Sequence, residues 1–432
     1  MDFLADLSLV DGPLWWFSIL AGIGGALFLL WRRSGKWPLY VGAAVLLAVG
    51  TVLLVHWLLI FVTSTFPAEL PPEVLAWSIP PVAALFLLLL RIPRASWRGR
   101  AAGVVAVLGV VLLSSVQING YFGLHHTLGD LMGTAVARIP PLEESLKRQP
   151  APAEAVPLSQ WHPTDDLPTD GILRKASIPG TVSGFEARDA FIYLPPAYQA
   201  AQRPSLPVLV LFSGQPGAPS DWLTGGALRS HMDRFAASHN GIAPVVVVAD
   251  PNGTPDGNTL CLDSRIAKAD TYLSQDVTSW IRQNLDVDAD PGKWAVGGFS
   301  FGGTCAMQMG TRHPEIFTSI LAFSSEKEPA LAKERRKTIE AAYGDDEAAF
   351  DQQTPLTLMA QKRYPGSAVY FGAGARDPEF IGYMNLLANA ARNAGFSVKT
   401  TEIANTGHSW DAPSMGMADA LGFLAARWGI QE

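Results

Sequence analysis

The chain has 432 residues, of which 48% are hydrophobic and only 16% are charged, and its formal net charge is −7. An average soluble domain carries about 25% charged residues. The deficit is concentrated in residues 1–120, which are 10% charged with net +2, whereas the remaining 312 are 19% charged with net −9. This composition excludes a disordered chain, a coiled coil and a collagen-like repeat. It also argues against a nucleic-acid-binding protein, because no basic stripe is present to neutralise phosphates.

Four uncharged runs near the start of the chain are long enough to cross a bilayer, whose hydrocarbon core needs about 20 apolar residues and at least about 17. The runs are 12–31, 37–68, 74–90 and 101–129. They predict an all-α, four-helix transmembrane domain over 1–130, with a kink at Pro80-Pro81. The alternative, a cleaved signal peptide before a buried helical domain, fits poorly because charged loops separate the four runs.

Among the N-terminal segment and the three loops between these runs, only the first and third loops contain basic residues. They are Arg32, Arg33 and Lys36, then Arg91, Arg94, Arg98 and Arg100. Cytoplasmic loops carry the excess of Lys and Arg, so we expect a multi-pass protein of the cell membrane with everything after 130 on the extracytoplasmic side. His56 inside the second run marks either a polar pathway or an interfacial histidine beside Trp57.

Beyond the apolar runs, seven prolines between residues 139 and 169 predict an extended linker over 131–170. From 171 to 432 short apolar runs alternate with helical periodicity, which predicts an α/β domain of three layers with a mainly parallel sheet. The expected strands are 189–194, 207–213, 244–250, 293–299, 318–324, 368–374 and 397–403, and the expected helices are 270–284, 301–312, 378–395 and 412–428.

The motif Gly298-Phe299-Ser300-Phe301-Gly302 joins an expected strand to an expected helix. This is the context in which G-x-S-x-G forms a nucleophile elbow, a turn so sharp that the neighbours of the serine must lack side chains. The serine hydroxyl then projects at the positive N-terminus of the helix. A glycine-rich packing turn is the alternative.

A serine hydroxyl needs a base, and in this arrangement the partners follow in the order Ser…Asp/Glu…His. Only two histidines follow Ser300, and His313 lies in the helix directly behind it, so His408 is the expected base. The expected acid is Asp377, just past the strand 368–374, with Glu379 as its rival. Ordinary loop residues are the alternative for each position.

Two backbone N–H groups are expected to form an oxyanion hole, one from Phe301 and one from Gln215, because Pro216 has no N–H to donate. An exported domain meets an oxidising compartment, so Cys261 and Cys305 are expected to form a disulfide, with two buried thiols as the alternative. No residues have metal-ligand spacing and no phosphate-binding loop is present, so we expect neither a metal nor another cofactor.

Together the segments GGFSFGGTCAM, FSGQPGAPSDW, TYLSQDVTSWI and TGHSW resemble the esterase family of α/β-hydrolases that includes esterase D, feruloyl esterases and the antigen-85 mycolyltransferases. The resemblance covers about 171–432. It implies an α/β-hydrolase fold, a Ser300–Asp377–His408 triad and an oxyanion hole lined by Gln215 and Phe301. Trp410 fits the G-H-x-W turn of the family, which implies a place in substrate binding.

We therefore expect a membrane-anchored serine esterase that hydrolyses carboxylic esters of membrane or envelope lipids through an acyl-enzyme. Aminoacyl-phosphatidylglycerol is a candidate substrate by analogy with four-span membrane esterases of high-GC Gram-positive bacteria. Two alternatives stay open: an acyltransferase of the mycolyltransferase type that uses the same triad, and a catalytically silent membrane receptor or scaffold.

Overall fold

The structure is a computed structural model that describes residues 2–148, 156–163 and 166–430. It divides into two compact units. One comprises Met1–Ala135 with Leu331–Arg335, and the other comprises Val136–Ala330 with Arg336–Glu432. The two are called the helical unit and the α/β unit below.

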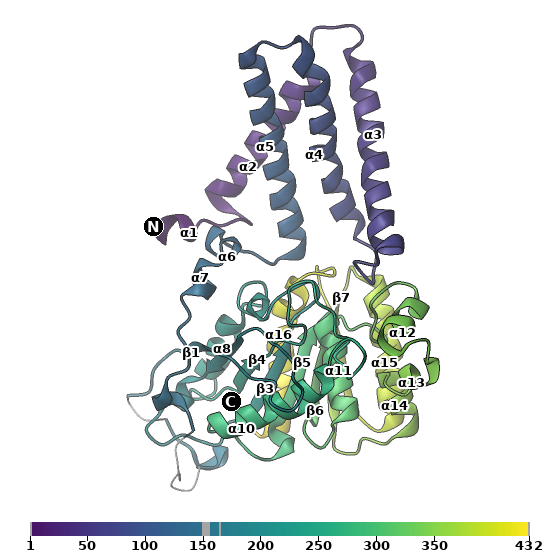
Figure 1. The fold of residues 1–432 in the computed structure, drawn as a ribbon. Coiled ribbons are helices and arrows are strands. Elements are labelled where there is room, and N and C mark those ends of the chain that lie inside the picture. The colour runs from purple at the N-terminus through teal and green to yellow at the C-terminus, as the bar shows by residue number, and fades with distance from the viewer. Residues whose placement is uncertain (1, 149–155, 164–165, 431–432) are drawn as a thin grey trace. The chain divides into compact units, whose positions relative to one another are not determined.

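The helical unit contains four long helices, each apolar and long enough to cross a membrane (Figure 1). They are α2 (Gly12–Leu30), α3 (Trp37–Trp57), α4 (Pro72–Arg91) and α5 (Trp97–Phe122), and α3 continues through a π-helical turn, Leu58–Val62. The shorter elements are α1 (Asp2–Ala5), a 3-10 turn Ile92–Arg94, α6 (Leu128–Leu131) and α7 (Thr134–Ala137). The four predicted apolar helices are therefore confirmed.

One of these helices ends earlier than the sequence predicts. The helix expected to reach 129 ends at Phe122, because Gly123 takes the left-handed conformation (φ 62°) that closes a helix. Helix α4 contains Pro80 and Pro81 in its interior, and the kink expected there stays a prediction. In this helix the Ser78 hydroxyl donates a hydrogen bond to the Val74 carbonyl at 2.8 Å.

The α/β unit is built on one eight-stranded sheet with the strand order β1-β2-β4-β3-β5-β6-β7-β8. The strands are β1 (Ile172–Ala176), β2 (Ala190–Leu194), β3 (Val208–Phe212), β4 (Val245–Val248), β5 (Trp294–Phe299), β6 (Ser319–Phe323), β7 (Ala368–Gly374) and β8 (Ser397–Ile403). Strands β3 to β8 pair in parallel, while β2 pairs antiparallel with both β1 and β4. Strands β2 to β7 are buried along their whole length.

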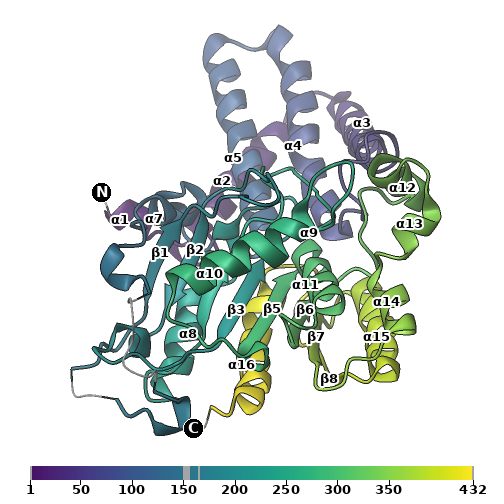
Figure 2. The same ribbon diagram turned by 60° about the horizontal axis from the view of Figure 1, so that its bottom comes forward.

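Helices cover both faces of this sheet, which makes the predicted three layers (Figure 2). Helices α10 and α11 lie in front of the sheet in that view and α16 lies behind it. The helices are α8 (Leu228–Ala237), α9 (Ala269–Thr271), a π-helical turn Tyr272–Val277, α10 (Thr278–Asn284), α11 (Phe301–Arg312), α12 (Arg335–Tyr343), α13 (Glu347–Asp351), α14 (Pro355–Gln361), α15 (Pro378–Ala394) and α16 (Asp411–Trp428). Shorter 3-10 turns are Glu144–Leu146, Leu158–Gln160, Pro196–Gln199, Pro219–Trp222 and Pro291–Lys293.

All seven predicted strands are present within two residues at each end, whereas strand β1 and helices α8, α12, α13 and α14 were missed. Strand β1 is a half-buried edge strand that contains Arg174 and Lys175, so it lacks the apolar run used to find the others. Helix α8 starts after Ala227, which has a left-handed φ of 44° and provides no side-chain cap, so the sequence has no start signal there.

The predicted linker is partly outside the described residues, which do not include 149–155 and 164–165. Its described beginning lies along β1: the Lys175 N–H donates to the Pro140 carbonyl at 3.0 Å, and the Leu142 N–H donates to the Lys175 carbonyl at 2.9 Å. This part of the segment is thus held by backbone hydrogen bonds, as a strand would be. The limits of the linker stay a prediction.

Candidate active site

Ser300 lies at a sharp turn between β5 and α11. The strand ends at Phe299, the helix begins at Phe301, and Ser300 has φ 56° and ψ −120°. A non-glycine residue with positive φ is strained, and such residues cluster at functional sites. The turn has no room for neighbouring side chains, since a Cβ at Gly298 would collide with Gly302 and one at Gly302 would collide with the end of β3. The structure therefore has the strand–turn–helix geometry of a nucleophile elbow.

Two further side chains that the sequence singled out lie in line with this serine. The Ser300 Oγ is 2.9 Å from the His408 Nε2, and the His408 Nδ1 is 2.9 Å from an Asp377 carboxylate oxygen. Asp377 is only 8% exposed. Its rival Glu379 is exposed and accepts a hydrogen bond from the Tyr383 hydroxyl at 2.7 Å. The structure thus brings Asp377, not Glu379, within hydrogen-bond distance of the imidazole.

Aromatic side chains surround the imidazole of His408. The ring of Phe380 lies 4.0 Å from it and that of Phe299 lies 5.2 Å from it, centroid to centroid. Trp410 is 6% exposed and packs on Phe299 at 5.0 Å and on Trp222 at 5.2 Å. In this buried position Trp410 supports Phe299, which in turn packs on the imidazole. The expected contact of Trp410 with the substrate stays a prediction. Phe380 was missed, although its place three residues after the acid, in the first turn of α15, was a usable signal.

The loop after β3, which was expected to provide one oxyanion-hole donor, lies beside the elbow. A Cβ added at Gly214 would be 3.7 Å from the Ser300 Cβ. The next peptide bond, Gln215–Pro216, is cis, and the Gln215 side chain donates to the Asp256 carbonyl at 3.3 Å. In α11 the first helical hydrogen bond runs from the Thr304 N–H to the Ser300 carbonyl, so the N–H groups before it have no partner within the helix. The roles of the Gln215 and Phe301 amides stay predictions.

The same loop is held in place by buried charges. Asp221 accepts a hydrogen bond from the Ala218 N–H at 2.9 Å. Arg188 donates to the Gly217 carbonyl at 3.0 Å and pairs at 2.7 Å with Asp250, whose side chain is fully buried. Burial raises the pKa of Asp221 to about 6, because a buried carboxylate loses its hydration. These contacts fix the backbone next to Ser300.

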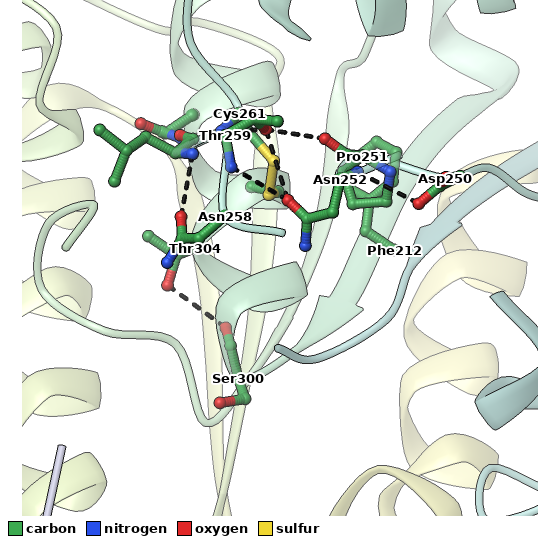
Figure 3. Close-up of a disulfide and its surroundings, with 12 residues drawn as sticks. Phe212, Asp250, Pro251, Asn252, Asn258, Thr259, Cys261, Ser300 and Thr304 are labelled. Carbon is green, nitrogen blue, oxygen red and sulfur yellow. Dashed lines mark hydrogen bonds between the residues drawn. A yellow bond between two sulfur atoms is a disulfide. The ribbon is translucent and has the colours of Figure 1, made fainter. Parts of the chain in front are cut away.

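The expected disulfide is present between Cys261, in the loop after β4, and Cys305, in the first turns of α11 (Figure 3). Its Cα atoms are 5.4 Å apart. Beside it the Gln308 side chain of α11 donates to the Leu260 carbonyl of the same loop. The bridge therefore clamps this loop onto the helix that begins immediately after Ser300.

The remaining candidates lie outside this arrangement. His313 lies at the end of α11 and pairs with Asp270 at 3.0 Å. Its pKa is raised, since the hydrogen bond and charge of Asp270 outweigh the burial that opposes protonation. Among residues 2–148, 156–163 and 166–430, no group of three or more His, Cys, Asp or Glu side chains could hold a metal ion.

Comparison with known proteins places the α/β unit in a family. The sequence model of the esterase family, described as putative esterase, matches residues 186–416. An uncharacterized protein of Corynebacterium glutamicum is 38% identical over 279 residues, which cover 62% of this chain and 65% of that protein. The match thus spans less than two thirds of that relative.

Solved structures agree on the fold. A ferulic acid esterase superposes with a TM-score of 0.50 at 19% identity, covering 60% of this chain and 99% of its own. An S-formylglutathione hydrolase from Agrobacterium tumefaciens gives 0.50 at 20% identity, covering 62% of this chain and 99% of its own. Both likenesses support the α/β-hydrolase architecture derived above. Because the family model matches more than half of the chain, the protein belongs to the esterase family of α/β-hydrolases, a family of serine hydrolases.

Proposed function

We propose that this protein is a membrane-anchored serine esterase in which Ser300, His408 and Asp377 form the catalytic triad. The single observation that carries the proposal is the continuous chain of two 2.9 Å contacts from the serine hydroxyl through the imidazole to a buried carboxylate. A strained turn, a base and an orienting acid in this order are what a serine needs to become a nucleophile.

The reaction follows from this geometry. Ser300 Oγ attacks the carbonyl carbon of the ester while His408 Nε2 takes its proton, and Asp377 stabilises the imidazolium that forms. The tetrahedral intermediate collapses, His408 returns the proton to the departing alcohol, and an acyl-enzyme remains on Ser300. Water then attacks the acyl carbon, its proton passes to His408, and the carboxylic acid leaves as the serine is regenerated.

Negative charge on the carbonyl oxygen needs donors while the intermediate exists. The first N–H groups of α11 have no partner within the helix, and they carry the positive end of its dipole. We assign the Phe301 amide as one donor and the Gln215 amide, from the loop held beside Ser300, as the other. Phe299, which packs between Trp410 and the imidazole of His408, keeps the imidazole in position for both steps.

The four apolar helices support a membrane anchor. Their 18-residue apolar windows are between 17% and 33% buried, so most of their side chains require a lipid environment. The basic residues of the 31–36 and 91–100 loops favour a cytoplasmic position for those loops, and this supports the proposal that the α/β unit lies on the extracytoplasmic side. The disulfide agrees with this side, because such bonds persist in oxidising compartments.

A tethered active site meets esters of the membrane or envelope at a high effective concentration. We therefore propose lipid esters as substrates and take aminoacyl-phosphatidylglycerol as the first to test. Transfer of the acyl group to a sugar or lipid hydroxyl instead of water would make the protein an acyltransferase, and product analysis with and without such an acceptor separates the two.

The test compares wild type with Ser300→Ala in the full chain, in membranes and in cells. We expect a fluorophosphonate probe to label the wild type only, and one lipid ester to accumulate only in cells that carry the variant. A folded wild type that the probe does not label would instead make the protein a catalytically silent receptor or scaffold. Labelling without any lipid change, together with rapid cleavage of a soluble ester, would overturn the lipid assignment.

A further inference from the structure

The segment that leaves β6 touches the nucleophile elbow. The Phe323 carbonyl, the last of β6, accepts the Ser300 N–H at 2.9 Å. The next residue, Ser324, has a left-handed φ of 43° and donates its N–H to the Gly372 carbonyl at 2.7 Å. This turn directs the chain toward α11 and brings Glu326 to the first turns of the helix.

Glu326 is joined to Thr304, one helical turn after the serine. The Thr304 Oγ1 is 2.7 Å from a Glu326 carboxylate oxygen, and the Glu326 N–H donates to the same hydroxyl at 3.0 Å. The Thr304 Oγ1 also lies 3.3 Å from the Ser300 carbonyl, a contact drawn in Figure 3. One hydroxyl thus connects the carboxyl group to the backbone of the nucleophile.

The direction of this contact depends on the proton of Glu326. When the carboxylate is ionised, the Thr304 hydroxyl donates to it. When the carboxyl is protonated, it can donate to the Thr304 oxygen, which leaves the threonine proton for the Ser300 carbonyl. Both states keep the side chains joined, and they differ in the charge beside the elbow.

The pKa of Glu326 lies above the usual range of a glutamate. Burial raises the pKa of Glu326 to about 7; the Thr304 hydrogen bond and the charge of His408 pull it down, and Glu379 pushes it up. Helix α15 contributes Tyr383 as well as Glu379 to this neighbourhood. The loop of Glu326 itself contributes Glu328, which also acts on Tyr383.

On the basis of the proposed esterase function, we propose that Glu326 is a positioning residue of the active site. It holds the first turn of the nucleophile helix through Thr304. It does not replace Asp377, which already occupies the Nδ1 side of the imidazole.

The experiment measures ester hydrolysis and fluorophosphonate labelling of the full chain in detergent from pH 5 to 9. In Glu326→Gln, which can still accept the Thr304 proton, we expect kcat within about threefold of wild type. In Glu326→Ala, which cannot accept that proton, we expect a loss of about tenfold in kcat. Thr304→Val should lower kcat by a similar factor.

Glu315→Gln is the matched control, because it removes a carboxyl that is 65% exposed just beyond the other end of the same helix. It should leave kcat unchanged. A fully active Glu326→Ala would overturn the positioning role, and so would a Glu326→Gln that loses as much activity as Glu326→Ala. If wild type is not labelled at all, the proposed function itself fails, and the two failures are thereby distinguished.

Discussion

The two units use the same apolar side chains in opposite ways. In the helical unit, Leu46 of α3 and Leu39 near its start are each 74% exposed. In the α/β unit, Val210 of β3 is 1% exposed and the neighbouring strand residues are buried on both faces. The first unit has an apolar exterior and the second an apolar core.

This contrast shows that each unit is adapted to its own solvent. Helices satisfy their backbone hydrogen bonds internally and can therefore present apolar side chains to lipid. A parallel sheet needs helices on both faces, and only then can its strand ends carry polar groups such as Asp377 in a fixed geometry. We expect the chemistry to depend on the α/β unit and the location to depend on the helical unit.

The largest expected effect is a loss of catalytic activity on substitution of Asp377, a residue of the α/β unit. Asp377→Asn should lower kcat by about 10⁴-fold, because the amide leaves His408 in the wrong tautomer, while membrane association stays unchanged. Glu379→Gln should alter kcat by less than about threefold, since that side chain is exposed and bonds to Tyr383. Steady-state kinetics on the two variants decides which carboxylate is the acid; equal losses would contradict the assignment.

A matched pair of substitutions tests the contrast in burial. Val210→Asp buries an unpaired carboxylate in the sheet and should unfold the α/β unit, a cost of at least about 4 kcal/mol. Leu46→Asp should leave hydrolysis in detergent intact but weaken membrane insertion by about 3 kcal/mol. Activity in detergent and membrane fractionation measure the two effects, with Leu46→Ala as the control. Similar behaviour of both aspartate variants would remove the distinction between the units.

The disulfide is expected to have the next largest effect. It closes a separation of 44 residues, so replacing Cys261 and Cys305 together by alanine should cost about 4 kcal/mol. For a unit of this size, the loss corresponds to a fall in Tm of about 7 °C. Thermal unfolding with and without reductant checks this result. Reductant should lower the Tm of wild type and leave that of the double variant unchanged. An equal fall in both would show that the disulfide is not the source of the stability difference.

The smallest expected effect is a pH dependence at Asp221. Its folded-state pKa is raised to about 6 from 3.8, so its proton is bound more tightly in the folded state. Its contribution to stability is therefore greatest below pH 3.8 and is lost as the pH rises through 6. Relative to wild type, Asp221→Asn should gain about 1–3 kcal/mol between pH 4 and 7. Denaturant unfolding at several pH values measures the difference, and a constant difference would refute this account.

Much of the fold was accessible from the sequence because its signals are local. Seven strands were predicted from short runs, six of which are buried along their whole length, and four helices from long apolar runs. Among the missed elements, strand β1 escaped because an edge strand tolerates charged residues, and helix α8 because its start lacks a cap. The π-helical turn Tyr272–Val277 inside a predicted helix also has no sequence signature.

The candidate site likewise contains residues that the sequence indicated and a contact that it did not. Ser300 and His408 follow from a motif and from the order of residues along the chain, and Cys261 and Cys305 from a simple count. The contact of Glu326 with Thr304 joins two segments that are 22 residues apart, and no pattern in either segment indicates it.

The sequence by itself determined the elbow, the order of the candidate triad and the apolar spans. These depend on steric limits at one turn and on runs of consecutive residues. Only the tertiary structure decided that Asp377 and not Glu379 meets the imidazole, that Trp410 is buried against Phe299 and Trp222, and that a second carboxyl lies against the elbow helix. Those outcomes depend on which segments meet after folding and on which side chains lose their hydration where they meet. The burial of a carboxyl group in particular depends on neighbours that are distant in the chain.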